Sequence, residues 1–271
     1  EKDYYVTIAL RALSRKLNDM VFKGGTSLTK CYQLLDRFSE DIDLSYTAES
    51  GAPGESRKRK LKKAIVSTMN EFNFPITNLD KTRSRRHYNC YRAHYPSLYN
   101  YDNLLKPELV IETYVALLPF PTTVRMVDNY IYRFLNKIDR LDLAKIYDLM
   151  PFAITTQTIE RTLVDKTFAL CDYYLEGKIE RHSRHLYDIH KIITTIGIPT
   201  ELPNLISQVR EARCKLSICL SAQPNICVTN ILHEIIEQQI YRIDYQNTTL
   251  GLLFIPESYD TVIQSLKLIA N

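Results

Sequence analysis

The chain has 271 residues, of which 45% are hydrophobic and 24% carry a charge, values close to the averages of globular proteins. This composition excludes an intrinsically disordered chain, and the small numbers of glycine and proline exclude collagen-like and low-complexity classes. No run of about 18 apolar residues occurs, so we expect no membrane-spanning helix and no membrane partner. Residues 1–135 hold 21 Lys and Arg against 15 Asp and Glu, whereas residues 136–271 hold 14 against 16. This asymmetry favours a polyanionic partner for the first half of the chain.

The six cysteines form no CxxC pair, and their spacing matches no zinc-binding pattern. They are Cys31, Cys90, Cys171, Cys214, Cys219 and Cys227. The pattern predicts free thiols in a reducing compartment, and hence a cytoplasmic protein.

Helices and strands alternate in the first half of the chain. The hydrophobic periodicity predicts helices over residues 1–17, 28–35 and 57–72, and strands over 20–22, 41–45 and 109–115. Beyond about residue 135 the pattern is mainly helical, with helices predicted over 137–149, 158–176, 181–196, 201–220, 225–241 and 256–270. We therefore expect an α/β (α+β) protein, with an α/β lobe over residues 1–135 and a helical lobe over residues 136–271.

Three acidic residues are candidates for a metal site. Asp41 and Asp43 alternate with apolar residues, so both carboxylates project from one face of the predicted strand. Glu112 is the single acid in a later buried strand that could lie beside it. Grouped carboxylates suit Mg²⁺, which prefers oxygen ligands and substrate phosphates. One or two such ions would activate an attacking oxygen and stabilise a leaving one.

A glycine pair precedes these acids at the end of the first predicted strand. Backbone N–H groups of Gly24 and Gly25, with the helix that follows, offer donors to an anion, and Thr26 and Ser27 add hydroxyls. The segment matches neither the P-loop pattern nor the GxGxxG dinucleotide-binding pattern. A glycine pair alone is more often a plain turn, and an Asp-x-Asp pattern alone is more often a solvated face or a loop. The ordered combination of the two favours a site that binds a polyphosphate and its metal ions.

A strongly basic stretch follows, with eleven Lys and Arg against three Asp and Glu in residues 53–92. Cations can bind phosphates and the interleaved tyrosines can stack on unpaired bases, so the stretch is a candidate RNA contact. The alternative is a solvated basic helix and loop. The candidate nucleic-acid-binding residues are Arg57, Lys58, Arg59, Lys60, Lys62, Lys63, Arg83, Arg85 and Arg86.

The order of these segments resembles the DNA polymerase beta-like nucleotidyltransferase superfamily, and within it the AbiEii/AbiGii toxin family. The most specific segments are Phe22-Lys23-Gly24-Gly25-Thr26-Ser27-Leu28 and Asp36-Arg37-Phe38-Ser39-Glu40-Asp41-Ile42-Asp43-Leu44. Later matches are 94–97, 160–166 and 184–188, so the resemblance covers residues 1–190. It implies a polymerase beta-like lobe with a mixed sheet, a helical lobe, and an active site in the cleft between them.

The resemblance also implies individual roles. Asp41 and Asp43 match the metal-binding DxD, and Glu112 stands where polymerases more usually have an aspartate. The segment from Lys23 to Ser27 would bind the nucleotide. Lys166 and Asp188 match the family's downstream lysine and aspartate, the lysine contacting the triphosphate. Asp188 would position Lys166, the nucleotide or the acceptor, although its spacing also allows pairing with Arg184. Arg161 is a further triphosphate-binding or structural candidate. From the residues alone, Lys166 is typical of an exposed helix lysine.

The implied activity is nucleotidyl transfer from a nucleoside triphosphate (NTP) with Mg²⁺, to an RNA 3′-hydroxyl, with tRNA as the expected acceptor. The family also implies a toxin that is countered by a cognate antitoxin. Transfer to a protein hydroxyl and a kinase-like transfer of the γ-phosphate remain alternatives. A non-catalytic module that binds nucleic acid or antitoxin is an alternative of another class, against which the Asp41/Asp43 pair and Lys166 argue.

Overall fold

The structure is a computed structural model that describes residues 1–39, 41–47, 53–99 and 106–270. It divides into two compact units, unit 1 (Glu1–Gln33 and Ser39–Thr158) and unit 2 (Leu34–Phe38 and Ile159–Asn271). The division after Thr158 falls later than the expected boundary at residue 135, because residues 136–158 pack and pair within unit 1. Glu40, part of the DxD segment, lies outside the described residues.

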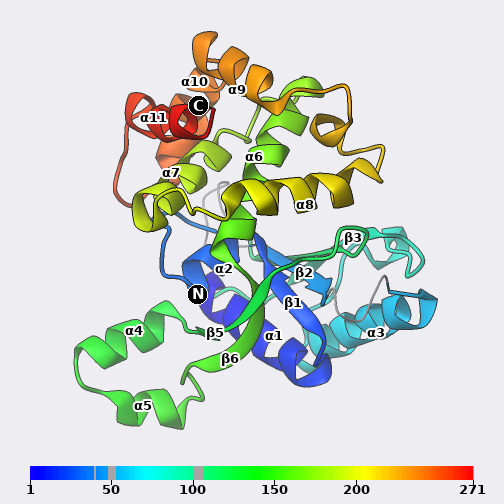
Figure 1. Cartoon of the computed structure of the whole chain (residues 1–271). Coiled ribbons are helices and arrows are strands. Elements are labelled where there is room, and N and C mark those ends of the chain that lie inside the picture. The colour runs from blue at the N-terminus through cyan, green and yellow to red at the C-terminus, as the bar shows by residue number, and fades with distance from the viewer. Residues whose placement is uncertain (40, 48–52, 100–105, 271) are drawn as a thin grey trace. The chain divides into compact units, whose positions relative to one another are not determined.

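Unit 1 is built on a six-stranded mixed sheet with the order β3-β4-β2-β1-β6-β5 (Figure 1). The strands are β1 (Met20–Lys23), β2 (Ile42–Tyr46), β3 (Tyr88–His94), β4 (Glu108–Tyr114), β5 (Thr122–Val127) and β6 (Phe152–Gln157). β2 runs parallel to β4 and β1 runs parallel to β6, whereas the other neighbours are antiparallel. The expected mixed sheet is confirmed, with β1, β2 and β4 within a residue or two of the predicted strands.

Three strands were not predicted. β3 lies in the basic stretch, where polar residues on its exposed face mask the alternation. β6 is rich in β-branched residues and pairs with both β1 and β5, yet it precedes a helix in a region predicted to be helical. The predicted helix over 137–149 is too long: only its middle is helical, as α5 (Leu141–Ile146), and a separate short helix, α4 (Tyr130–Lys137), precedes it.

Helices α1 (Lys2–Lys16) and α3 (Glu55–Glu71) pack on each other and contribute to the core of unit 1. In α3 the buried residues Leu61, Ile65 and Met69 recur every four positions, which places them on one face of the helix. Burial of each such side chain stabilises the fold by about 1.5–3 kcal/mol. The opposite face, with Arg59, Lys60 and Lys63, is exposed. The amphipathic pattern thus fixes which cations of α3 face solvent.

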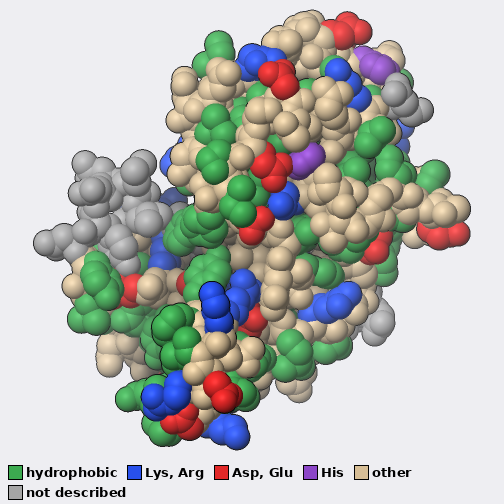
Figure 2. All heavy atoms as spheres, turned by 90° about the vertical axis from the view of Figure 1, so that its left-hand side faces the viewer, with side chains coloured by type: hydrophobic (Ala, Val, Ile, Leu, Met, Phe, Trp, Pro, Cys, Tyr) green, Lys and Arg blue, Asp and Glu red, His purple; other side chains and the backbone are tan. Residues whose placement is uncertain are grey.

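Short α2 (Gly24–Lys30) follows β1 directly, so this helix begins and ends earlier than the predicted helix over 28–35. Helices α4 and α5 carry several exposed apolar side chains, among them Phe134 and Ile146. Figure 2 faces this side of unit 1, and its charged groups of both signs are interspersed with apolar ones.

Unit 2 is helical, as expected. Its main helices are α6 (Ile159–Leu175), α7 (Arg184–Ile196), α8 (Leu202–Cys214), α9 (Val228–Glu237) and α11 (Tyr259–Ala270). α6 packs against α7, α8 and α9, and α11 packs against α7 and α9. Short elements complete the chain: a 3₁₀ turn at Leu79–Lys81 in unit 1, and in unit 2 Leu220–Ala222, α10 (Arg242–Asp244), Tyr245–Thr249 and Leu250–Leu252.

The segment Leu34–Phe38 belongs to unit 2 although its sequence neighbours belong to unit 1. It is held by backbone hydrogen bonds in which Phe38 N–H donates to Leu252 (3.1 Å) and Phe254 N–H donates to Asp36 (2.7 Å). Within the described part of the chain, no helix is both long and apolar enough to cross a bilayer.

Candidate active site

The carboxylates of Asp43 and Glu112 lie on neighbouring strands at the same level of the sheet of unit 1. The parallel register of β2 and β4 pairs Asp43 with Glu112, and both residues are half-buried among buried neighbours. Side chains at paired positions project from the same face, so the sheet brings these two acids together. Asp41 immediately precedes the first residue of β2 and is also half-buried. Of the three predicted acids, Asp43 and Glu112 are therefore the two that the strand register places side by side.

Gly24 lies directly against the carboxylate of Asp43. Its φ is +78°, and a Cβ atom built on it would be 2.0 Å from Oδ2 of Asp43. Only glycine combines this backbone conformation with the necessary space. The strand pairing of Lys23 with Asp43 produces the approach, so the glycine turn and the DxD strand form one structural feature.

Tyr88 and Cys90 flank the acids from β3. The Tyr88 hydroxyl donates a hydrogen bond of 2.8 Å to Oε1 of Glu112, and Cys90 is the register partner of Glu112. Burial, followed by the charge of Glu112, raises the pKa of both the Tyr88 phenol and the Cys90 thiol. Both groups therefore stay protonated near neutral pH, and Tyr88 is a fixed donor to Glu112.

The donor chemistry of this site suits Mg²⁺. Mg²⁺ commonly takes one or two protein carboxylates and completes its shell with water and substrate phosphates, which the Asp43–Glu112 pair allows. Within the described ranges, no group of three or more His, Cys, Asp and Glu side chains is arranged to hold a metal ion.

The other residues predicted to bind the nucleotide have protein partners. The Thr26 hydroxyl lies 2.9 Å from that of Ser39, and the Ser27 hydroxyl donates to the Gly24 carbonyl at 2.8 Å. Thr26 and Ser27 are both buried, and the Lys23 ammonium lies over the ring of Tyr114. Thr26 and Ser27 thus brace the turn that carries Gly24 and Gly25.

Unit 2 contains a buried cluster of two cations on one carboxylate. Arg37 donates from Nε to Oδ1 of Asp188 (2.6 Å) and from Nη2 to Oδ2 (2.8 Å), and the Lys166 ammonium lies 2.5 Å from the same Oδ2. The Asp188 side chain is fully buried, and those of Arg37 and Lys166 are 4% and 9% exposed. Lys166 is therefore not the exposed helix lysine that its sequence alone suggests, and Asp188 pairs with Arg37 and Lys166 rather than with Arg184.

The charges in this cluster shift each other's titration. Burial alone would raise the pKa of Asp188, but Arg37 and Lys166 hold it below its usual range. Burial lowers the pKa of Lys166, and Arg37 lowers it further, while Asp188 opposes both. Burial and the nearby Lys166 and Arg184 keep the pKa of His185 well below its ordinary value. Two cationic side chains, Arg37 and Lys166, therefore share the Asp188 carboxylate.

Arg161 is fully buried, and its Nε lies 3.2 Å from Oδ2 of Asp165. This environment favours the structural role for Arg161 over contact with a triphosphate.

The structure also sorts the predicted RNA-binding cations. Arg57 pairs with Asp19 and lies over the ring of Tyr46. The others that have partners are Lys58 (with His87), Lys62 (with the Thr82 carbonyl), Arg83 (with the Asp80 and Thr82 carbonyls), Arg85 (near Glu55) and Arg86 (with the Lys81 carbonyl). Arg59, Lys60 and Lys63 show no hydrogen bond or ion pair to the described residues, so these three are the most available for a ligand.

Comparison with known proteins identifies the family of the chain. The model of the family described as "Nucleotidyl transferase AbiEii toxin, Type IV TA system" matches residues 8–265. The chain belongs to the AbiEii nucleotidyltransferase toxin family. A solved structure with a similar fold is the nucleotidyltransferase toxin MenT4 from Mycobacterium tuberculosis H37Rv. That comparison has a TM-score of 0.50 and 15% identity, and covers 98% of this chain and 82% of MenT4. No curated protein sequence matches the chain.

As an AbiEii protein, the chain is a nucleotidyltransferase toxin of a toxin–antitoxin system. Membership of this family implies a partner antitoxin and an NTP substrate. Sequence reasoning assigned no role to Arg37, and it considered Tyr88 only as one of the tyrosines that could stack on RNA bases. Arg37 lies in the segment Asp36–Leu44 that carries the family resemblance, and this position could have marked it as a candidate site residue. Tyr88 carried no comparable signal, because its contact with Glu112 depends on the pairing of β3 with β4.

Proposed function

We propose that this AbiEii toxin is a Mg²⁺-dependent enzyme that transfers a nucleoside monophosphate from an NTP to an RNA 3′-hydroxyl, with tRNA as the acceptor, in the cytoplasm. The observation that carries the proposal is the Asp43–Glu112 pair, with the Asp43 carboxylate seated on Gly24. This arrangement holds two carboxylates at one level of the sheet, and the Asp43 carboxylate fits there because Gly24 has no side chain.

In the proposed reaction the acceptor 3′-oxygen forms a bond to the α-phosphorus, the bond to the pyrophosphate oxygen breaks, and the hydroxyl proton is lost to solvent. Mg²⁺, when bound, would neutralise phosphate charge and activate the attacking oxygen. Asp43 and Glu112 would hold the metal, with Asp41 as the further ligand that the sequence predicts, and Tyr88 would orient Glu112 by donating to it. Positioning and electrostatic stabilisation would supply most of the rate enhancement, as in other phosphoryl transfers.

We assign the contact with the triphosphate to Lys166, positioned by Asp188. The ion pair between Lys166 and the buried Asp188 carboxylate supports this assignment, because it fixes the position of the lysine side chain that would contact a phosphate. RNA as acceptor is supported by the unpaired cations on the exposed face of α3.

The test is transfer of label from each α-labelled NTP, with Mg²⁺ and total cell RNA, followed by separation of RNA from protein. Label on a tRNA-sized band that disappears with Asp43→Asn is the expected result. Label on protein alone would overturn the RNA acceptor, and label from γ-labelled NTP alone would overturn nucleotidyl transfer. An exposed acid away from the site, Asp80→Asn, serves as the matched control.

A further inference from the structure

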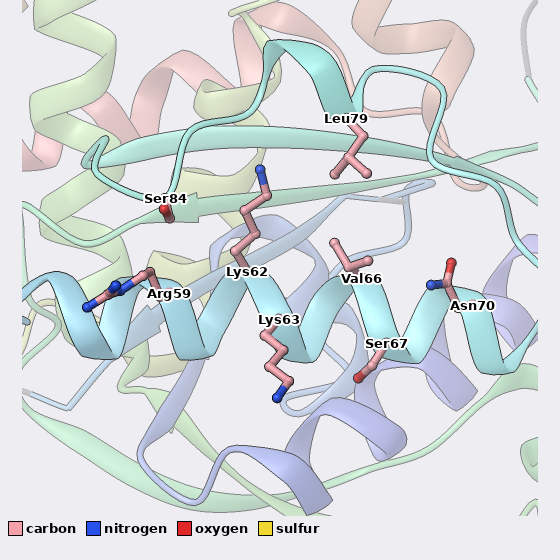
Figure 3. A pocket seen from close by; sticks show the side chains of 8 residues that line it. All are labelled: Arg59, Lys62, Lys63, Val66, Ser67, Asn70, Leu79 and Ser84. Atoms are coloured by element: carbon pink, nitrogen blue, oxygen red, sulfur yellow. The ribbon is translucent and has the colours of Figure 1, made fainter.

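A shallow groove of about 400 Å³ lies along α3 in unit 1. It is lined by Arg59, Lys62, Lys63, Val66, Ser67, Asn70, Leu79 and Ser84 (Figure 3). In Figure 3, Lys62 points toward the segment that carries Leu79 and Ser84, whereas Lys63 and Ser67 extend on the other side of the helix. The groove is therefore flanked by cations on both sides of α3.

The lining is positive and carries no acid. Arg59 and Lys63 are exposed and have no hydrogen-bond or ion-pair partner among the described residues. Lys62 donates to the Thr82 carbonyl at 3.0 Å, so its charge remains uncompensated. Three cations without a carboxylate among them favour an anionic ligand.

The far wall of the groove is fixed by side-chain hydrogen bonds. Asn89 accepts from the N–H of Arg83 (2.8 Å) and donates to its carbonyl (3.0 Å), and the Thr82 hydroxyl donates to the Leu79 carbonyl (2.8 Å). With Lys62 bonded to Thr82, the segment over 79–84 is tied to both α3 and β3. The groove is thus preformed, which reduces the entropy lost when a ligand binds.

The dimensions suit a short length of one nucleic-acid strand. From Arg59 to Asn70 the groove follows α3 for roughly 16 Å at 1.5 Å per residue, which exceeds the size of a single phosphate. Val66 and Leu79 face each other across it and provide apolar surface between the polar groups (Figure 3). The cavity is at the lower end of the 300–1,000 Å³ that is usual for small-ligand sites, too small to enclose a duplex.

The groove lies close to the candidate active-site acids within the same unit. Ser84, at one end of its lining, is four residues before Tyr88, whose hydroxyl bonds Glu112. Four extended residues span at most about 14 Å. A strand lying in the groove could therefore reach Glu112 and Asp43 within a few nucleotides.

We propose that this groove binds the phosphate backbone of the unpaired 3′ segment of the acceptor RNA. The proposal rests on the proposed function and adds the path of the acceptor. Arg59 and Lys63 contact phosphates, Lys62 contributes charge while holding the wall, and a base or ribose packs on Val66 and Leu79. Of the nine cations predicted from the sequence, those lining the groove are the three that bind RNA.

The test measures binding of a fluorescein-labelled, 3′-unpaired RNA oligonucleotide to the full chain without NTP, across a salt series. The groove variant is Arg59→Gln/Lys63→Gln. The control, Lys137→Gln/Lys145→Gln, removes the same charge at two exposed positions outside the groove and outside α3. Loss of two phosphate contacts is expected to weaken binding about tenfold and to reduce the slope of log Kd against log salt by roughly 1.4. The control is expected to stay within about twofold of the wild-type chain.

A second pair of variants avoids removing any native cation. Ser84→Glu places an acid in the groove and is expected to weaken RNA binding, whereas Ser56→Glu places the same charge in the exposed first turn of α3 and is expected to leave it unchanged. Melting temperatures of all variants identify any loss of binding that is caused by misfolding. If one groove variant is destabilised, the result is taken from the other groove variant.

The outcomes separate the groove from the proposed function. Wild-type binding by both groove variants, or equal losses in groove and control variants, would overturn the groove as the RNA path even if label transfer to RNA persists. Equal competition by an acidic peptide or by a fully paired duplex would overturn the choice of unpaired RNA. Absence of label transfer to RNA in the wild-type chain, with groove-dependent binding intact, would count against the proposed reaction alone.

Discussion

Arg37 and Asp188 are 151 positions apart in the sequence, and two hydrogen bonds of 2.6 and 2.8 Å join the guanidinium of one to the carboxylate of the other. The Lys166 ammonium shares that carboxylate at 2.5 Å. Arg37 thereby prevents Asp188 from forming a simple neutral pair with Lys166. The position of the Lys166 ammonium therefore depends on a carboxylate that Arg37 also holds.

Replacement of Arg37 tests this positioning role. Arg37→Gln should raise the KM for NTP more than it lowers kcat, because Lys166 would be held by Asp188 alone. It should also destabilise the protein by about 3–5 kcal/mol, the usual effect of breaking a buried ion pair. Arg37→Lys, which keeps a cation, should recover part of both losses in steady-state kinetics and in chemical denaturation.

The pH profile distinguishes positioning from simple destabilisation. Arg37 lowers the pKa of Lys166, so its removal should move the alkaline limb of kcat/KM to higher pH, since Lys166 then keeps its proton longer. Arg37→Lys should leave that limb near its wild-type position. An unmoved limb in Arg37→Gln would show that Arg37 acts only on stability.

The paired acids should be essential for activity and nearly neutral for stability. Asp43→Asn and Asp41→Asn should each lower transfer at least a thousandfold, while the free energy of unfolding changes by less than about 1 kcal/mol, because neighbouring like charges contribute little to folding. Near-wild-type transfer by either variant would remove that residue from the metal site. Activity assays alongside urea denaturation measure both effects.

Gly24 offers a sharper test, because a matched glycine exists. Gly24→Ala should place its Cβ against the Asp43 carboxylate and strain a φ of +78°, whereas Gly177→Ala strains a φ of +69° with nothing within 4 Å of the new atom. Both should cost about 1–2 kcal/mol in stability from the left-handed backbone. Only Gly24→Ala should also lower kcat by tenfold or more. Equal activities of the two variants would show that the Gly24–Asp43 approach has no catalytic importance.

The hydrogen bond from Tyr88 to Glu112 leads to a prediction about metal dependence. Tyr88→Phe should raise the Mg²⁺ concentration needed for half-maximal activity about tenfold, with activity recovered at high Mg²⁺, because the Glu112 carboxylate loses an orienting donor. Tyr99→Phe, at an exposed position, is the control. An unchanged Mg²⁺ requirement in Tyr88→Phe would argue against Glu112 as a metal ligand.

Much of the fold could be predicted because its elements have strong local patterns. Helix α1, basic α3 and strands β2 and β4 follow from hydrophobic periodicity within a residue or two. β3, β5 and β6 could not be predicted in this way, because their character comes from pairing with distant strands. The helix predicted over 137–149 was too long, because only α5 (Leu141–Ile146) forms within it, and the apolar residues on either side belong to turns and to a small core shared with α4.

The sequence by itself determined the chemistry available: the DxD acids, the glycine pair and the basic helix are local patterns whose residue types already suit phosphate and metal. The tertiary structure decided which of these groups act together. Register placed Glu112 beside Asp43, strand pairing brought Gly24 against its carboxylate, and packing in unit 2 joined Arg37 to Asp188 and Lys166. Packing also left Arg59 and Lys63 without partners while engaging Arg57 and Arg83. These contacts join residues far apart in the chain, and such distances are fixed only when sheet register and helix packing are formed.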